Sequence, residues 1–302
     1  MTTRDFPVAI GRGSGAPADP APGEVPSLRP AATVMLVRDG EAGLEVFVLR
    51  RASTMAFAPS MHVFPGGGVD PRDCVDDLPW AGPSVAEWST VMGCPEAEVR
   101  GLVTAAAREV FEETGVLLAA AEDGGDPVET LGGSAEVARG RRALVERELS
   151  FAELLHGAGL TLRSDLLTYR ARWITPEFQP QRYDTAFFLA EVPWGQEPDG
   201  ETTEADHSAW VRPGDLLAEA DAGTARLMPP TVVSLEQLAA AGSVAEAFAR
   251  PPSTTAILPV LADTPAVVPV VKGHGYGFGL VRLAAECRRL GVDTIAVGMV
   301  SE

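Results

Sequence analysis

Hydrophobic and polar positions in the first quarter of the chain follow patterns that are typical of β-strands. Residues 32–37 form a largely aliphatic run, and residues 44–49 (LEVFVL), apolar except for Glu45, are typical of a second strand. A turn sequence at 38–40 separates the two runs, so a hairpin is predicted. A third short strand is expected at 61–64, and the Pro-Gly-Gly-Gly stretch at 65–68 then predicts a tight loop.

The pattern becomes helical between Glu96 and Glu113. Apolar residues recur there at spacings of three and four, which places them on one stripe of a helix. Pro95 suits the start of this helix, and Gly115 suits its end. Further along the chain, the sequence predicts strands at 167–173, 185–192 and 208–211 and helices at 213–220 and 231–241.

Composition and charge narrow the classes of function. The 302 residues carry 42 acidic and 24 basic side chains, a formal net charge of −18. General nucleic-acid binding and binding to an anionic membrane both call for a basic surface, so neither partner is expected. An anionic substrate would need a local device, such as a metal ion, a few arginines or backbone N–H groups.

The remaining composition favours a cytoplasmic location. The three cysteines are widely spaced and suggest neither a metal cluster nor a disulfide framework. No apolar run approaches the roughly 20 residues that span a bilayer. The N-terminus also lacks the pattern of a secretory signal.

Three carboxylates on one face of the predicted helix are the strongest sign of chemistry. Glu109, Glu112 and Glu113 lie three and four positions apart and project to the same side. Each like-charged pair destabilises a helix by about 0.2–0.5 kcal/mol unless a cation lies nearby. Mg²⁺ or Mn²⁺ takes oxygen ligands and keeps several waters, which can supply a nucleophile. A solvated acidic face is the commoner interpretation of a bare Glu-x-x-Glu-Glu pattern.

The sequence context resembles the Nudix box, whose pattern is G-x5-E-x7-R-E-U-x-E-E-x-G-U, where U is aliphatic. Residues 108–116 (REVFEETGV) match the second half of this pattern in full. Residues 64–67 (FPGG) match its glycine half, so Gly66 and Gly67 are counted among the substrate-binding residues.

The resemblance implies roles for these residues and a reaction. Glu109, Glu112 and Glu113 would bind Mg²⁺ or Mn²⁺, and Arg108 would orient the glutamates through salt bridges. Gly67 would shape the loop before the helix. The implied reaction is hydrolysis of a diphosphate linkage in a small-molecule nucleoside diphosphate derivative, and the implied fold is an α/β/α sandwich around a mixed sheet.

The sequence departs from the family pattern inside the box. A few tens of residues are inserted between about residues 69 and 97. Counting back from Arg108 puts Arg100 at the position of the family's first glutamate, whereas counting forward from Gly67 puts Asp73 there. The first carboxylate of the box therefore has no assignment from the sequence.

A box split by an insertion resembles the branch of the family that includes the peroxisomal coenzyme A diphosphatase. Residues 64–70 (FPGGGVD), 173–176 (WITP) and 182–188 (RYDTAFF) resemble the same branch. The resemblance covers about residues 30–245 and points to coenzyme A or acyl-coenzyme A as the substrate.

Several other charged residues are candidates for the site. Arg50 and Arg51 end a predicted strand, and guanidinium groups match phosphate oxygens; solvated strand-end charges are the alternative. Arg182 either faces the substrate or pairs with Asp184. Glu204 is the best placed of the later acidic residues to serve as a base or an extra ligand.

The last segment has a different pattern. Residues 266–302 predict a strand, a Gly-rich loop, an amphipathic helix and a second strand. They resemble the N-terminal edge of alanine racemases, in which the lysine of V-V-K-x-x-x-Y-G-x-G forms a Schiff base with pyridoxal phosphate, and Lys272 and Tyr276 match. Such a short unit cannot close an eight-stranded barrel. It is expected to be a truncated second domain or an accessory element.

These observations predict an α/β fold of the Nudix type with an insertion inside the box and a C-terminal βαβ appendage. We expect a disordered tail at 1–30, the hydrolase domain at 31–245, a linker at 246–265 and the appendage at 266–302. The alternatives to an active hydrolase are a binding or sensing module without turnover and a fragment of a pyridoxal-phosphate enzyme. The sequence allows a homodimer but does not determine the oligomeric state.

Overall fold

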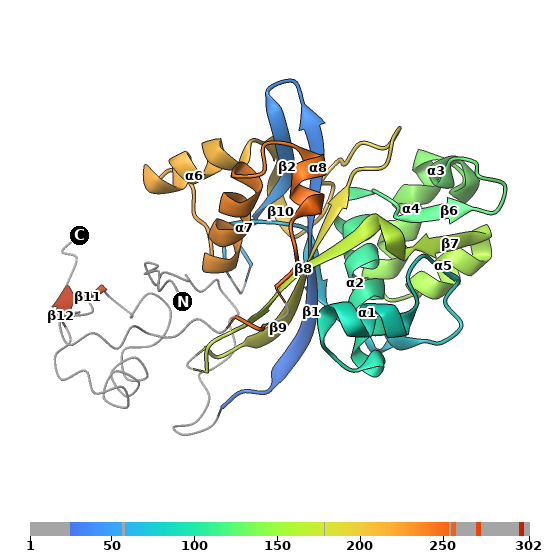
Figure 1. The fold of residues 1–302 in the computed structure, drawn as a ribbon, viewed down its shortest axis with the longest axis horizontal. Coiled ribbons are helices and arrows are strands. Elements are labelled where there is room, and N and C mark those ends of the chain that lie inside the picture. The colour runs from blue at the N-terminus through green and yellow to red at the C-terminus, as the bar shows by residue number, and fades with distance from the viewer. Residues whose placement is uncertain are drawn as a thin grey trace.

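A mixed β-sheet runs through the centre of the molecule (Figure 1). In the computed structural model, the described residues are 25–55, 58–177, 179–253, 255–257, 270–272 and 296–298. The main strand order is β10-β2-β1-β9-β8. The bounds of these strands are Leu28–Gly40 for β1, Gly43–Arg51 for β2, Leu167–Ile174 for β8, Arg182–Glu191 for β9 and Ala205–Val211 for β10.

The pairing of the strands fixes where the loop before the box helix lies. β1 pairs in parallel with β9 and antiparallel with β2, while β2 also pairs with β10. The short strand β3 (His62–Val63) adds to β2, and β4 (Gly66–Gly68) adds to β1. The Gly-rich segment is therefore held against the middle of the sheet as a strand and not as a free loop.

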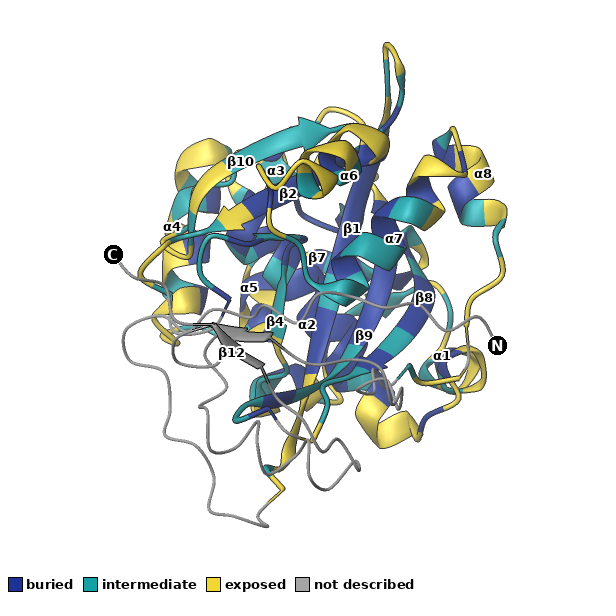
Figure 2. Cartoon of the chain, turned by 90° about the vertical axis from the view of Figure 1, so that its left-hand side faces the viewer, coloured by how far each residue is buried: buried dark blue, intermediate teal, exposed yellow. Residues whose placement is uncertain are grey.

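Helices cover both faces of this sheet. The box helix α2 (Glu96–Thr114) packs on one face, and α6 (Pro213–Asp221), α7 (Pro229–Ala239) and α8 (Val244–Ala249) cover the other. The alternation of β2 shows the division, because Phe47 and Leu49 join the core beside α2 whereas Val46 and Val48 join the core beside α7. The central strands are buried and the outer helix faces are exposed (Figure 2). The predicted α/β/α sandwich with a mixed sheet is confirmed.

The box helix forms where its periodicity predicts it. Pro95 is its N-cap, and Glu96 and Glu98 lie in the first turn, where negative charge favours a helix. The helix ends at Gly115, which has a φ of 76° and donates its N–H to the carbonyl of Phe111. Val99 and Val110 are fully buried on the apolar stripe.

The residues between the two halves of the box form compact elements of their own. They comprise the 3₁₀ turn η1 (Pro71–Cys74), β5 (Trp80–Ala81) and α1 (Val85–Met92). β5 belongs to a second small sheet of order β5-β7-β6, with β6 at Ala119–Ala121 and β7 at Leu160–Arg163. Three helices accompany this sheet: α3 (Pro127–Leu131), α4 (Ser134–Val145) and α5 (Phe151–Ala158).

The structure packed on the main sheet continues past residue 245, the predicted end of the domain. Helix α8 crosses that boundary, and the backbone of Ile257 bonds to Arg172 and Ile174 of β8. Residues 270–272 (β11) and 296–298 (β12) form a parallel pair, as the predicted βαβ unit requires. Its predicted loop and helix, Tyr276 included, lie outside the described residues, as does the predicted tail over residues 1–24.

No helix in the described ranges combines the length and the apolar character needed to cross a membrane.

Candidate functional site

The Gly-rich strand β4 lies directly against the carboxylates of the box helix. The backbone N–H of Gly66 donates to Oε2 of Glu113 at 2.8 Å. A Cβ atom at Gly67 would overlap the carboxylate of Glu109, so only glycine leaves this carboxylate its place. The structure thus brings together the two halves of the box that the insertion separates in sequence.

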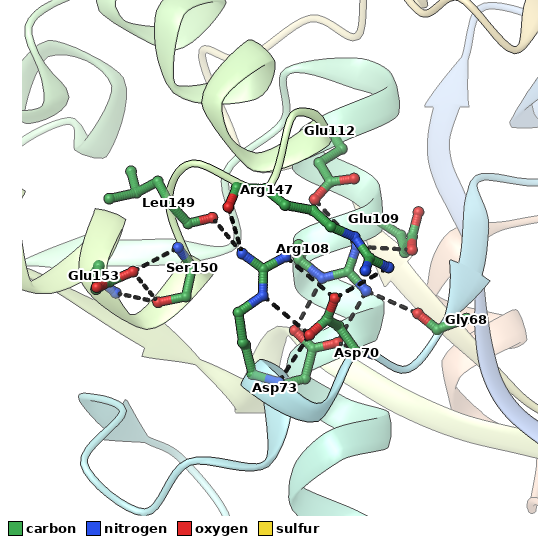
Figure 3. A network of polar contacts seen from close by, with 11 residues as sticks. Gly68, Asp70, Asp73, Arg108, Glu109, Glu112, Arg147, Leu149, Ser150 and Glu153 are labelled. Carbon is green, nitrogen blue, oxygen red and sulfur yellow. Dashed lines mark hydrogen bonds and ion pairs between the residues drawn. The ribbon is translucent and has the colours of Figure 1, made fainter.

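Arg108 is the centre of the ion-pair network (Figure 3). Its Nη1 donates to Glu109 at 2.8 Å and to Glu112 at 3.1 Å. Its Nε and Nη2 each donate to Asp73 at 2.9 Å, and Nη2 also donates to the carbonyl of Gly68 at 2.9 Å. One planar guanidinium therefore holds three carboxylates and the end of β4 in fixed relative positions.

Asp73 is the acidic partner that the sequence left unassigned. Its side chain is 2% exposed and its carboxylate forms a bidentate pair with Arg108. Arg100 is the residue that counting back from Arg108 puts at the position of the first glutamate. It lies 3.3 Å from Asp76 and over the ring of Trp80. Counting forward from the glycine is therefore the direction that leads to the site, because the insertion follows Asp73.

A short turn fixes Asp73 in place. Asp70 caps η1, and its backbone N–H donates to Asp73 while its carboxylate accepts from the backbone of Arg72. The Arg72 guanidinium holds the pKa of Asp70 at about 2. Arg72 also donates to the carbonyls of Arg147 and Leu149, which attaches the turn to the segment after α4.

Burial raises the pKa of each of the three box glutamates. It raises the pKa of Glu109 to about 7, although Arg108 opposes the shift and the charge of Glu112 adds to it. Burial also raises the pKa of Glu112, again against Arg108. The pKa of Glu113 lies well above its usual range because of burial first and the charge of Glu109 second.

Arg108 itself is held in its charged form. Burial alone would lower its pKa, but its hydrogen bonds to Asp73 and the charges of Glu109 and Asp73 raise it. Arg108 offsets one negative charge at contact distance, whereas Asp73 and the three glutamates carry up to four. A further cation is the simplest way to relieve this excess.

The donor set suits a hard divalent cation. Carboxylate oxygens from Glu109, Glu112 and Glu113 are the ligands that Mg²⁺ and Mn²⁺ prefer. Within the described ranges, no three acidic, His or Cys side chains already form a metal-binding cluster. Cation binding would therefore require these side chains to turn toward a common point.

Arg51 and Glu204 lie on the box-helix side of β2. The backbone N–H of Ala52 donates to the carbonyl of Glu204 at 2.8 Å, and Nη2 of Arg51 is 3.8 Å from the Glu204 carboxylate. The charges of Glu204 and Arg51 both act on Glu113. The structure thus brings both predicted residues to the rim of the carboxylate cluster.

Arg50 and Arg182 are not brought to the cluster. Arg50 points to the opposite face of the sheet and pairs with Asp206 at 2.6 Å. Arg182 is buried and donates to the backbone carbonyls of Thr175 and Pro26. The proposed pairing of Arg182 with Asp184 is also not observed, since Asp184 accepts from Nε of Arg172 at 2.6 Å.

Comparison with known proteins agrees with this geometry. A Caenorhabditis elegans protein provisionally named nudix hydrolase 7 is 30% identical over 213 residues, which cover 70% of this chain and 61% of that protein. An acyl-coenzyme A diphosphatase of Gallus gallus is 31% identical over 184 residues, 50% of this chain and 49% of that protein. The chain therefore spans less than two thirds of the length of these relatives. No family model matches it.

A solved structure supports the same assignment. The crystal structure of a NUDIX hydrolase from Alicyclobacillus acidocaldarius superposes with a TM-score of 0.57 at 29% identity and covers 75% of this chain and 97% of its own. In both sequence and fold, the chain is similar to Nudix hydrolases. These relatives lend no support to the alanine racemase resemblance of residues 266–302.

Proposed function

We propose that this chain hydrolyses a diphosphate linkage in a nucleoside diphosphate derivative, with Mg²⁺ or Mn²⁺ held by Glu109, Glu112 and Glu113. The main support is the cluster of nearly buried carboxylates. Their combined negative charge exceeds the single positive charge of Arg108. A purely structural acidic face would be solvated, whereas the side chains of Glu109 and Glu112 are each only 12% exposed. Burial of this kind favours a bound cation.

The residues of the chain would divide the work as follows. Asp73 fixes Arg108, and Arg108 would keep Glu109 and Glu112 close together on the box helix, from where they could turn toward a cation. Gly66 holds Glu113 through its backbone N–H. When bound, the cation would activate the attacking water and offset charge on the diphosphate.

The rim residues would bind the substrate and accept a proton. Arg51 presents a guanidinium that can donate to phosphate oxygens. Glu204 lies beside it and would accept a proton from the attacking water or add an oxygen ligand. The products would be two fragments, each ending in a phosphate.

Coenzyme A or an acyl-coenzyme A is the substrate that we propose. The support is the Gallus gallus relative, whose name assigns it acyl-coenzyme A diphosphatase activity, and the insertion that splits the box. We also retain the cytoplasmic location expected from the sequence.

A hydrolysis screen tests this proposal. Purified protein with Mg²⁺ or Mn²⁺ would be assayed on coenzyme A, acyl-coenzyme A, NADH, ADP-ribose and dinucleoside polyphosphates, with products resolved by chromatography. Turnover of coenzyme A derivatives is expected, and Glu112→Gln should lower kcat by about 10²-fold or more. Glu96→Gln is the matched control, because Glu96 lies on the same helix but is exposed.

The opposite results are equally clear. Wild-type-like turnover in Glu112→Gln would refute the assignment of the box glutamates. Binding of a substrate without turnover by the wild type would identify a binding or sensing module in place of an enzyme.

A further inference from the structure

Arg141 is a buried arginine outside the box that joins two parts of the site. It lies in α4 and is only 6% exposed, whereas the neighbouring Arg142 is exposed. A buried guanidinium is tolerated only when partners match its charge and its N–H groups. Its partners therefore identify what Arg141 holds together.

The guanidinium of Arg141 contacts the box helix and the loop after β9 at the same time. Its Nε donates to the backbone carbonyl of Glu112 at 3.0 Å. Its Nη1 donates to both carboxylate oxygens of Asp199, at 2.9 and 2.7 Å. Its Nη2 donates to the carbonyl of Glu201 at 2.9 Å. A rigid fork can serve all these acceptors together, which a lysine ammonium cannot.

The loop that Arg141 holds also carries Glu204. The N–H of Asp199 donates to the carbonyl of Thr114 at 3.1 Å, so this loop is fastened to the last residue of the box helix. Asp199 also accepts from the N–H of Glu201 at 2.8 Å. The chain then reaches Glu204, which bonds to the backbone of Ala52 at 2.8 Å.

The position of Glu204 depends on the contacts of its loop. Its carboxylate lies 3.8 Å from Nη2 of Arg51. The side chain is half exposed, so its own burial does not fix it in place. Arg141 supplies a positive charge and four hydrogen bonds at the point where the loop meets the box helix.

We propose that Arg141 is a positioning residue that keeps Glu204 beside the box carboxylates. This inference rests on the hydrolysis proposed above. Arg141 does not touch the reacting atoms; it acts through the loop between Asp199 and Glu204. Its substitution should therefore impair only the step that needs Glu204.

A double-mutant cycle tests this role. Arg141→Gln should lower kcat roughly 10- to 100-fold, as expected for a displaced catalytic group, and change KM less than about threefold. In a Glu204→Gln background, the same substitution should change kcat less than about twofold, because Glu204 no longer needs positioning. Arg142→Gln, the exposed neighbour, should leave kcat unchanged.

Two further measurements keep the test decisive. If Arg141→Gln does not fold, Asp199→Asn replaces it, because Asp199 is the partly exposed carboxylate that pairs with Arg141. This variant should also lower kcat, but by a smaller factor. Hydrogen exchange of residues 199–205 reports the loop without any turnover and should accelerate in Arg141→Gln but not in Arg142→Gln.

Three results would overturn the inference. These are an unchanged kcat in Arg141→Gln, an equal loss in the Glu204→Gln background, and unchanged exchange of the loop. A wild type that hydrolyses none of the substrates would instead refute the proposed function, and the exchange measurement would still decide the role of Arg141.

Discussion

At the scale of single residues, the buried pair of Asp73 and Arg108 determines where the box glutamates lie. The two side chains are 2% and 10% exposed. Nε and Nη2 of Arg108 donate to Asp73, and Nη1 donates to Glu109 and Glu112. A defect at Asp73 should thus affect both stability and the metal site.

Replacing Asp73 by asparagine leaves the charge of Arg108 without its main partner. Loss of one partner from a buried pair typically costs about 3–5 kcal/mol, so the free energy of unfolding should fall by about that amount. Urea denaturation measures the change. Asp76→Asn is the control, because the Asp76 side chain is 98% exposed and should matter little. Equal stability of the two variants would contradict the central role of Asp73.

Gly67 and Gly68 offer a matched pair of substitutions. A Cβ at Gly67 would overlap the Glu109 carboxylate, whereas a Cβ at Gly68 meets nothing closer than 4.0 Å. Gly67→Ala should weaken kcat at subsaturating Mg²⁺ by roughly tenfold or more, since it displaces a ligand. Gly68→Ala should behave like the wild type in the same titration. Similar activities in both variants would count against the role of Glu109.

The sequence identified much of this site because its motif is local. Residues 108–116 lie on one helix, so their spacing alone places three glutamates on one face. Arg50 and Arg51 could not be separated in the same way. They point to opposite faces of β2, and only the packing of the strand shows which face meets the box helix.

At the scale of elements, the box helix and the central strands were predictable, whereas the small second sheet was not. The helix has a long apolar stripe and clear ends at Pro95 and Gly115. In contrast, β5, β6 and β7 are short, and their positions depend on pairing with one another. Arg141 was missed because Asp199 and Glu201, two of its partners, lie in a loop that is distant in sequence.

The raised carboxyl pKa values on the box helix predict a pH dependence of the metal-free protein. The pKa of Glu109 is about 7 in the folded protein, compared with an ordinary value of 4.5. Between these two pKa values, the folded state therefore keeps a proton that the unfolded state has lost. The free energy of unfolding falls as the pH rises toward 7. In EDTA, the melting temperature should be lower at pH 8 than at pH 6.

Mg²⁺ or Mn²⁺ should restore the melting temperature at pH 8, because a cation binds the ionised carboxylates of the folded state. Glu109→Gln should flatten the pH dependence in EDTA. An unchanged or higher melting temperature at pH 8 in EDTA would show that the buried carboxylates do not govern stability.

At the scale of the whole molecule, the net charge of −18 is consistent with a site that binds anions through local devices. The sheet separates the box-helix side from the side covered by α6, α7 and α8. Arg51 and Glu204 lie on the first side, and Arg50 pairs with Asp206 on the second. All the proposed chemistry therefore lies on one face of the sheet.

The C-terminal segment is expected to contribute no pyridoxal-phosphate chemistry. The relatives and the solved structure give no support to the alanine racemase resemblance of this segment. Adding pyridoxal phosphate to the protein should produce no aldimine absorbance band that depends on Lys272. A band that disappears in Lys272→Ala would show that this segment binds the cofactor.

The central claim is that the box glutamates hold a divalent cation, and Mn²⁺ binding measured without substrate tests it most directly. Calorimetric titration of the wild type should show binding at neutral pH. Glu112→Gln should bind at least about tenfold more weakly, because one charged ligand is lost, whereas the exposed-site variant Glu96→Gln should bind like the wild type. Equal affinity of Glu112→Gln and the wild type would contradict the claim.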